Sequence, residues 1–274
     1  QIFQAITGNV SDLTGVIAYV EESSSPTNKT SSLKIMDVSG QTIRTLDTVS
    51  GSIMTPAFSR DGTQIAYSTQ ADQGLPVIRV ISVSGGQPQL VTPFWGHNLA
   101  PSFSPDGTSL LFSGSHENNN PNIYRLHLNT NRLERITNLS GAENSPNYLP
   151  DGSGFIYTAD HGTRSQSLQR YDFNSGRSQQ IAARASNPRL SLDGSKLVYV
   201  ASGRIVIANP QGRVQQSFAV PGTEVSASFS PSGNSIVYAA SQGNQSRLVI
   251  RSLTSNASRT ILSSGTVRDP IWSN

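Results

Sequence analysis

Short runs of alternating apolar and polar residues recur along the whole chain, with turn residues between them. The clearest example covers residues 56–67, where Pro-Ala-Phe-Ser leads into Arg-Asp-Gly-Thr and a second apolar run ends at Tyr67. Alternation with a period of two is typical of β-strands that bury one face. The Asp-Gly pair favours a tight turn, because aspartate accepts backbone hydrogen bonds and glycine tolerates positive φ. The segment therefore predicts a β-hairpin in which Asp61 and Gly62 are structural.

The same hairpin pattern recurs at nearly regular spacing. Further copies cover residues 101–112, 146–157, 188–199 and 227–238, and the turn glycines at positions 62, 107, 152, 194 and 233 lie 39 to 45 residues apart. A repeat of about 40 to 45 residues is typical of four-stranded β-propeller blades. Two more strand-like segments follow each inner hairpin, and we predict six such outer pairs, at 33–38 with 42–46, 77–83 with 89–92, 122–128 with 133–137, 168–173 with 178–182, 204–208 with 214–219, and 247–253 with 259–262.

The two ends of the chain supply the inner hairpin that is missing from this count. Residues 16–20 match the second strand of the repeat, and residues 269–274 match the first. We expect these segments to pair, because their pairing closes the ring and leaves no sheet edge open. The sequence thus predicts an all-β fold, a six-bladed β-propeller of four-stranded blades over residues 14–274. Residues 1–13 are expected to be a lead-in or linker from a missing N-terminal domain.

Up-and-down connectivity predicts two different faces on such a ring. The tight Asp-Gly turns occupy one face, and variable loops that lead into each blade occupy the other, at 49–55, 93–100, 138–145, 183–187, 220–226 and 263–269. Binding residues tend to lie on loops held by a rigid scaffold. We therefore predict a partner-binding site at the mouth of the central channel, formed by Met54, Thr55, Trp95, His97, Asn98, Ala100, Glu143, Asn144, Ser186, Glu224 and Arg268.

Two interpretations of the aromatic residue in this set stay open. Trp95, close to His97, is suited to anchoring a partner, but a tryptophan at this place can equally pack between blades. A catalytic role for His97 is disfavoured, because a general base needs a positioned partner and a substrate. We predict no catalytic residue.

Charge and composition exclude several kinds of chemistry. The chain has 20 Lys and Arg against 17 Asp and Glu, a formal net charge of +3, and no cluster of basic residues interleaved with aromatics. Nucleic acid is therefore not expected as a partner. No apolar run approaches the roughly 20 residues that cross a bilayer, so no membrane span is predicted. The absence of cysteine excludes disulfides, thiolate catalysis and Cys-based zinc sites.

No metal and no other cofactor is predicted. His116, His127 and His161 lie on separate segments without a metal-binding spacing. Acidic residues near the mouth, Glu143, Glu224 and Asp269, favour a solvated rim over a site for a hard cation.

The repeated Pro-x-Phe-Ser-Pro-Asp-Gly core resembles the repeats of the TolB family, the periplasmic propeller proteins of the Tol-Pal system in Gram-negative bacteria. Three further features are similar to that family: the entry at residues 2–8 and 17–20, the Phe-Trp-Gly-His-Asn-Leu-Ala-Pro segment at 94–101, and the Pro-x-Trp-Ser ending at 270–273. The resemblance implies a non-catalytic periplasmic protein that binds the lipoprotein Pal at the channel mouth. It also implies competition by bacteriocin segments there and a role in outer-membrane integrity and in envelope constriction at cell division.

Family roles carry over to individual residues of this sequence. His97 and Ala100 match the family's Pal-contact loop, and Met54 sits at the matching loop of the preceding blade. Asn144 matches a polar contact residue of the next blade, with Glu143 as the alternative because of an apparent one-residue insertion. The family's TolA-binding segment belongs to its N-terminal part, which is missing here, so TolA binding is not assigned to this chain.

Other six-bladed propellers also carry the core motif, including the propeller domains of prolyl oligopeptidase relatives. The alternative function is therefore a propeller enzyme or an enzyme-gating domain, either lactonase-like or peptidase-associated. That alternative would need inward acidic or metal-binding residues, or an attached hydrolase domain.

Overall fold

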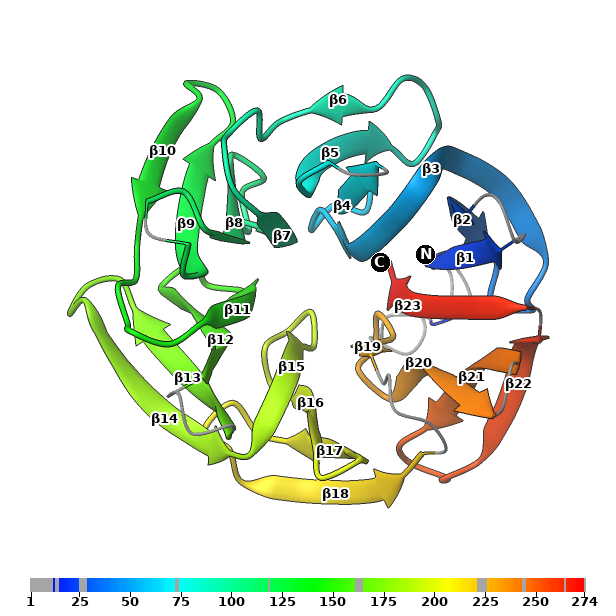
Figure 1. Ribbon diagram of the computed structural model, residues 1–274. Coiled ribbons are helices and arrows are strands. Elements are labelled where there is room, and N and C mark those ends of the chain that lie inside the picture. Colours follow the sequence, from blue (N-terminus) through cyan, green and yellow to red (C-terminus); the bar gives the residue numbers. More distant parts are fainter. Residues whose placement is uncertain are drawn as a thin grey trace.

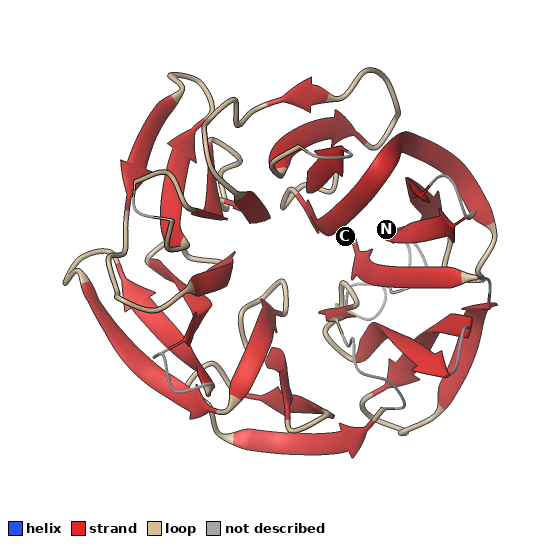
Figure 2. Cartoon of the chain, in the orientation of Figure 1, coloured by secondary structure: helices blue, strands red, loops and turns tan. Residues whose placement is uncertain are grey.

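The strands of the computed structural model stand radially around a central axis and form a ring (Figures 1 and 2). The structure describes residue 12 and residues 15–24, 29–71, 74–117, 119–160, 165–220, 226–242, 245–263 and 265–273. Within these ranges the regular secondary structure is all β, and no helix could cross a membrane. All strand pairs are antiparallel, as in the pairing of β7 with β8. The predicted propeller of antiparallel four-stranded blades is confirmed in these respects.

Four of the sheets contain four strands each, with the first-named strand nearest the axis. They are β7 (Asn98–Phe103), β8 (Ser109–Gly114), β9 (Asn122–His127) and β10 (Arg132–Arg135); β11 (Glu143–Tyr148), β12 (Gly154–Asp160), β13 (Gln166–Asp172) and β14 (Arg177–Ala183); β15 (Ala185–Leu190), β16 (Leu197–Ala201), β17 (Arg204–Ala208) and β18 (Val214–Ala219); and β19 (Ala227–Phe229), β20 (Ser235–Gln242), β21 (Gln245–Ser252) and β22 (Ser258–Ser263).

The remaining sheet has seven strands because one long strand serves two blades. Its hydrogen-bonded order is β23 (Thr266–Trp272), β1 (Ile17–Ser24), β2 (Lys29–Met36), β3 (Thr42–Phe58), β4 (Gln64–Ala71), β5 (Val77–Ser82) and β6 (Gln89–Leu90). Residues 42–50 of β3 pair with β2, and residues 51–58 pair with β4. If the seven-stranded sheet is divided between these two halves of β3, it gives two groups of four strands. Together with the four other sheets, the described strands then form six four-stranded groups.

The prediction of a loop at 49–55 is wrong, because these residues belong to the continuous strand β3. The prediction expected a connection from the rim to the axis here, but Gly51 keeps its strand pairing and its carbonyl accepts a hydrogen bond from Ser31 Oγ at 2.9 Å. The predicted loop at 183–187 is also almost absent, since only Arg184 separates β14 from β15. Longer connections remain between β6 and β7 and between β10 and β11.

The two ends of the chain pair in one sheet, as predicted. Ile17 of β1 lies opposite Trp272 of β23, and Ala18 lies opposite Ile271. Val16 N donates to Ser273 Oγ at 3.0 Å. Figure 1 shows the red strand β23 beside the blue strand β1.

Apolar side chains fill the spaces between neighbouring blades. One cluster combines Ala66 and Ile78 of the sheet containing β4 with Phe103, Leu110 and Phe112 of the next sheet. Burying a large apolar side chain contributes about 1.5 to 3 kcal/mol. This packing fixes the inner strands, whose ends surround the axis.

Candidate binding site at the channel mouth

Five inner strands bend at the residue that precedes a proline. These residues are unusual in having positive φ, namely Thr55 (49°), Ala100 (54°), Ser145 (51°), Asn187 (54°) and Asp269 (49°). The strand register shifts at each of these places. Proline has no N–H to give to the strand ladder, so a bulge forms there. Positive φ is costly in residues with a Cβ, and such conformations cluster at functional sites.

The same five residues line a cavity of about 110 Å³ at the axis of the ring. They present two hydroxyls, a methyl group, a carboxamide and a carboxylate at equivalent backbone positions. One repeated backbone conformation thus places different chemical groups around a single opening. We call these five residues the bulge ring.

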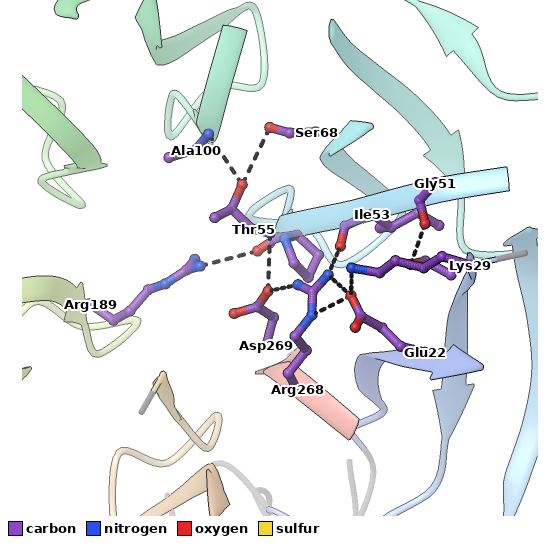
Figure 3. Close-up of polar contacts among 12 residues, drawn as sticks. Glu22, Lys29, Gly51, Ile53, Thr55, Ser68, Ala100, Arg189, Arg268 and Asp269 are labelled. Atoms are coloured by element: carbon purple, nitrogen blue, oxygen red, sulfur yellow. Dashed lines mark hydrogen bonds and ion pairs between the residues drawn. The ribbon is translucent and has the colours of Figure 1, made fainter. Parts of the chain in front are cut away.

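Hydrogen bonds join members of the bulge ring across blade boundaries (Figure 3). Thr55 N donates to Asp269 Oδ2 at 3.4 Å, and Ala100 N donates to Thr55 Oγ1 at 3.2 Å. Ser145 Oγ donates to Asn187 Oδ1 at 3.5 Å. A change at one position is therefore transmitted to a neighbouring blade.

Arg268, predicted to contact a partner, instead holds the mouth together from within. Its guanidinium donates to Glu22 Oε1 (3.0 Å from Nε), to Asp269 Oδ2 (2.6 Å) and to the carbonyl of Ile53 (2.6 Å). Lys29 Nζ lies 3.3 Å from the same Glu22 oxygen. Burial raises the pKa of Glu22, but the hydrogen bond and charge of Arg268 outweigh burial and lower it overall. Only 15% of the Arg268 side chain is exposed, so it is a positioning residue.

Arg189 lies deeper in the channel. Its Nη2 reaches across the axis to the carbonyl of Pro56, at 3.1 Å. It lines both the 110 Å³ cavity and a second cavity of about 160 Å³ on the side of the tight turns. Burial lowers the pKa of Arg189, and the charge of Asp269 opposes that effect. Sequence reasoning missed this residue, although an arginine directly after the repeat proline was a usable signal.

The connection at 93–98 exposes the largest apolar side chain of the mouth. Trp95 is 84% exposed, so the interpretation that it packs between blades is wrong. Gly96 adopts a φ of 89°, and a Cβ there would lie 2.7 Å from the carbonyl oxygen of Ser115. His97 is also exposed, while its backbone N donates to Ser115 Oγ at 3.0 Å. The backbone is therefore held against the sheet while both side chains face outward.

Asn98 is the main brace beneath this connection. Its Nδ2 donates to the carbonyls of Pro76 (3.1 Å), Phe94 (3.3 Å) and Gly96 (3.0 Å). The side chain is completely buried, so the prediction that it contacts a partner directly is wrong. Its role is to fix the loop that carries Trp95.

His116 supports the same loop from an aromatic surrounding. Its ring lies 4.7 to 5.8 Å from the rings of Phe94, Phe112 and Tyr124, in edge-on arrangements. Burial lowers the pKa of His116, so the ring is neutral at pH 7. Nδ1 bonds to the carbonyl of Trp95, and because a carbonyl only accepts, Nδ1 carries the proton. From the sequence, only a metal-ligand role was considered for this histidine, and its spacing disfavoured that role.

Glu143 repeats the bracing role of Asn98 one blade further on. Its carboxylate accepts from Asn122 Nδ2 at 2.9 Å and from Leu139 N at 3.4 Å, and the residue is completely buried. Glu143 had been predicted to contact a partner and to form part of a solvated acidic rim. Its complete burial contradicts both predictions for the side chain. Among the described residues no group of three or more His, Asp or Glu is placed to hold a metal ion.

The other predicted residues differ in how they are placed. Met54 and Asn144 are half-buried next to Thr55 and Ser145, and Asn144 Oδ1 accepts from Ser113 Oγ at 3.0 Å. Ser186 lines a separate groove of about 660 Å³. Glu224 lies outside the described residues.

Comparisons with known proteins agree with this geometry. A family model described as the TolB β-propeller domain matches residues 3–274. The crystal structure of TolB from Acinetobacter baumannii is 36% identical, with a TM-score of 0.88, over 99% of this chain and 70% of that one. No curated protein sequence matches the chain.

More distant structures share the fold alone. A chain of a nidogen/laminin complex is 11% identical with a TM-score of 0.68, over 95% of this chain and 98% of that one. A prolyl endopeptidase structure is 15% identical with a TM-score of 0.54, over 92% of this chain and 42% of that one.

Proposed function

Because the chain belongs to the family of TolB β-propeller domains, we propose that it is a non-catalytic, periplasmic protein-binding module of the Tol-Pal system in a Gram-negative bacterium. Its partner is the lipoprotein Pal, which docks on the channel mouth. The likeness to Acinetobacter TolB over nearly the whole chain carries this proposal. In this function the six four-stranded groups over residues 14–274 form the ring, and residues 1–13 are a lead-in to it.

The braced loop at 93–98 supports the choice of the mouth as the docking face. Trp95 is 84% exposed, yet the backbone around it is fixed by Asn98, His116 and Ser115. Exposed aromatic residues on a fixed backbone are the usual anchors of protein interfaces, because little conformational entropy is lost on binding. His97, Ala100, Thr55, Met54 and Asn144 surround this anchor as the contact set.

The remaining mouth residues divide into two roles. Asn98, Glu143 and Arg268 position the contact residues from below, and Ser186 and Glu224 stay in the proposed contact set. Bacteriocin segments would compete with Pal for the same face. Pal binding here would support outer-membrane integrity and envelope constriction during division, and we ascribe TolA contacts to residues upstream of the ring.

Titration calorimetry with purified Pal tests this proposal. Trp95→Ala should lose about 2 kcal/mol of binding free energy, roughly thirtyfold in Kd, and His97→Ala about tenfold. Leu90→Ala, an exposed apolar residue on an outer strand, and His127→Ala, beside the tight turns, are matched controls and should bind normally. Unchanged affinity in both mouth variants would sink the docking face, and no binding by the unaltered protein would sink the proposed partner.

A further inference from the structure

The tight turns of four inner hairpins each carry their own carboxylate. In the turn at 191–195, Asp193 Oδ1 accepts from Ser191 Oγ at 2.6 Å and from Ser195 N at 3.0 Å. Asp61 and Asp106 accept the same two kinds of bond, and Asp151 accepts from the N–H two residues later. A carboxylate thus completes each of these turns from within.

The fifth turn, at 230–234, has serine where the others have aspartate. Ser232 Oγ accepts from Asn234 N at 3.1 Å, so the hydroxyl replaces one of the missing carboxylate contacts. Unlike a carboxylate, this hydroxyl still has a proton to donate. Serine in place of aspartate therefore keeps an acceptor in the turn and adds a donor.

A carboxylate from a distant part of the chain uses that donor. Asp12 Oδ2 accepts from Ser232 Oγ at 2.9 Å, and Asp12 Oδ1 accepts from Ser232 N at 3.0 Å. Two parallel bonds to one carboxylate give both strength and a defined orientation. An aspartate at position 232 would repel Asp12.

Burial at the fifth turn agrees with a covered surface. Pro231 and Gly233 are buried, whereas the corresponding residues of the other turns are half-buried or exposed. Lys196 Nζ, which donates to the carbonyl of Gly233 at 2.6 Å, covers one side. Asp12, itself half-buried, lies against Ser232.

We propose that the turn at 230–234 is a carboxylate-binding site that anchors the chain at Asp12 to the face of the tight turns. β19 begins at the 110 Å³ cavity of the mouth and ends at this turn. The anchor therefore lies on the face opposite the proposed Pal site, and it fixes where the chain enters the ring without occupying the mouth.

Amide hydrogen exchange at Ser232 tests the contact directly. In the full chain, Asp12→Ala should speed exchange of the Ser232 amide about tenfold, which corresponds to about 1.4 kcal/mol. The Ser195 amide, bonded to the carboxylate of its own turn, is the internal control and should not change. Equal exchange at Ser232 in the variant and the parent would overturn the proposal.

A second pair of variants tests the chemistry of the site. Ser232→Asp gives the fifth turn the aspartate that the other four turns carry, so the turn should stay folded. Because the bonds to Asp12 are lost, chymotrypsin cleavage after Leu13 should accelerate about tenfold. The exchange D12S combined with S232D restores a hydroxyl–carboxylate pair and should recover at least half of the lost protection. Cleavage of Ser232→Asp at the parent rate would also contradict an anchor at this site. Neither variant should change Pal affinity, so failure here is distinguishable from failure of the proposed function.

Discussion

At the face of the tight turns, each aspartate bonds to residues two positions away in its own hairpin, whereas at the mouth the hydrogen bonds join different blades. Asp106 Oδ1 accepts from Thr108 N at 3.0 Å, while Ala100 N donates to a residue 45 positions earlier. Four of the five turns repeat both the backbone and the aspartate side chain. The mouth repeats only the backbone, since the five residues of the bulge ring are of five different types and carry four kinds of group: hydroxyl, methyl, carboxamide and carboxylate.

This difference separates the residues that form the fold, in the tight turns, from the residues that are suited to recognising a partner, at the mouth. The carboxylate bonds of the four aspartate turns lie within one hairpin, so substitution of such an aspartate should be felt mainly in that hairpin. Bonds between blades make the mouth a coupled unit, so a substitution there displaces neighbours. Variation of side chains on a constant backbone is suited to recognition, and constant side chains are suited to folding.

The largest effect on stability should come from removing the guanidinium of Arg268, which joins strand β23 to the mouth. Arg268→Ala leaves the carboxylates of Glu22 and Asp269 partly buried without their main partner. Loss of one member of a buried ion pair costs about 3 kcal/mol or more. Urea denaturation should show that loss for Arg268→Ala, and less than about 1 kcal/mol for Arg79→Ala, whose contact with Asp47 is long (3.8 Å) and more exposed. Equal losses would contradict the coupling.

Adjacent residues on the braced loop should separate folding from binding. Asn98→Ala removes the side-chain amide that donates to the carbonyls around it and should cost about 2 kcal/mol in the free energy of unfolding. His97→Ala should cost less than about 0.5 kcal/mol, because its side chain is exposed. Both variants should bind Pal more weakly in calorimetry. A stable Asn98→Ala variant with full affinity would show that the loop needs no brace.

A tight turn should respond to substitution only locally. Asp106→Ala removes the acceptor for Ser104 Oγ and Thr108 N and should cost about 1 kcal/mol in urea denaturation. Pal affinity should stay within twofold of the parent value. A large loss of affinity would mean that the two faces are coupled after all.

Acid should loosen the two regions in separate pH ranges. Burial lowers the pKa of His116 below its ordinary 6.5, against the opposing effects of the Trp95 carbonyl and Glu117. The unfolded state then binds protons first, so the stability of the loop falls as the pH drops below about 6.5. The hydrogen bond from Ser104, followed by that from Thr108 N, lowers the pKa of Asp106. The contribution of Asp106 to the stability of its turn is therefore present above pH 3.8, its ordinary pKa, and is lost only as the pH falls below that value.

Amide exchange of residues 93–98 and 104–108 at pH 7, 5.5 and 3.5 measures this small effect. Protection at 93–98 should fall first, by a few-fold at pH 5.5, while the turn at 104–108 stays protected. His116→Gln, which keeps a donor without titrating in this range, is the control and should remove the first step. Simultaneous loss in both segments would contradict the separation.

The repeat made the architecture predictable, because turn chemistry and alternation agree in every blade. It did not reveal that β3 continues through two blades, since the hydrogen bonding of Gly51 depends on neighbouring strands. The binding region stays a prediction, and the structure shows which of its predicted side chains are exposed and which are buried. Proximity to the mouth does not distinguish a side chain that points outward from one that points into the sheet.

The side chains that are buried at the mouth share one position in the repeat. The residue three places before the inner proline is buried in five blades, as Ile53, Asn98, Glu143, Ala185 and Val267. Three of these residues are apolar, and the polar pair occurs where a longer connection needs bracing. Alignment of the repeats by their prolines was the signal that separates the buried Asn98 and Glu143 from the exposed or half-buried residues of the mouth.

The most direct test of the central claim is an amide-exchange footprint of the protein with and without bound Pal. We predict slower exchange at 93–100 and 143–146 in the complex, and unchanged exchange in the turns at 59–63, 104–108 and 191–195. Protection confined to the turns, with none at 93–100, would contradict docking at the channel mouth.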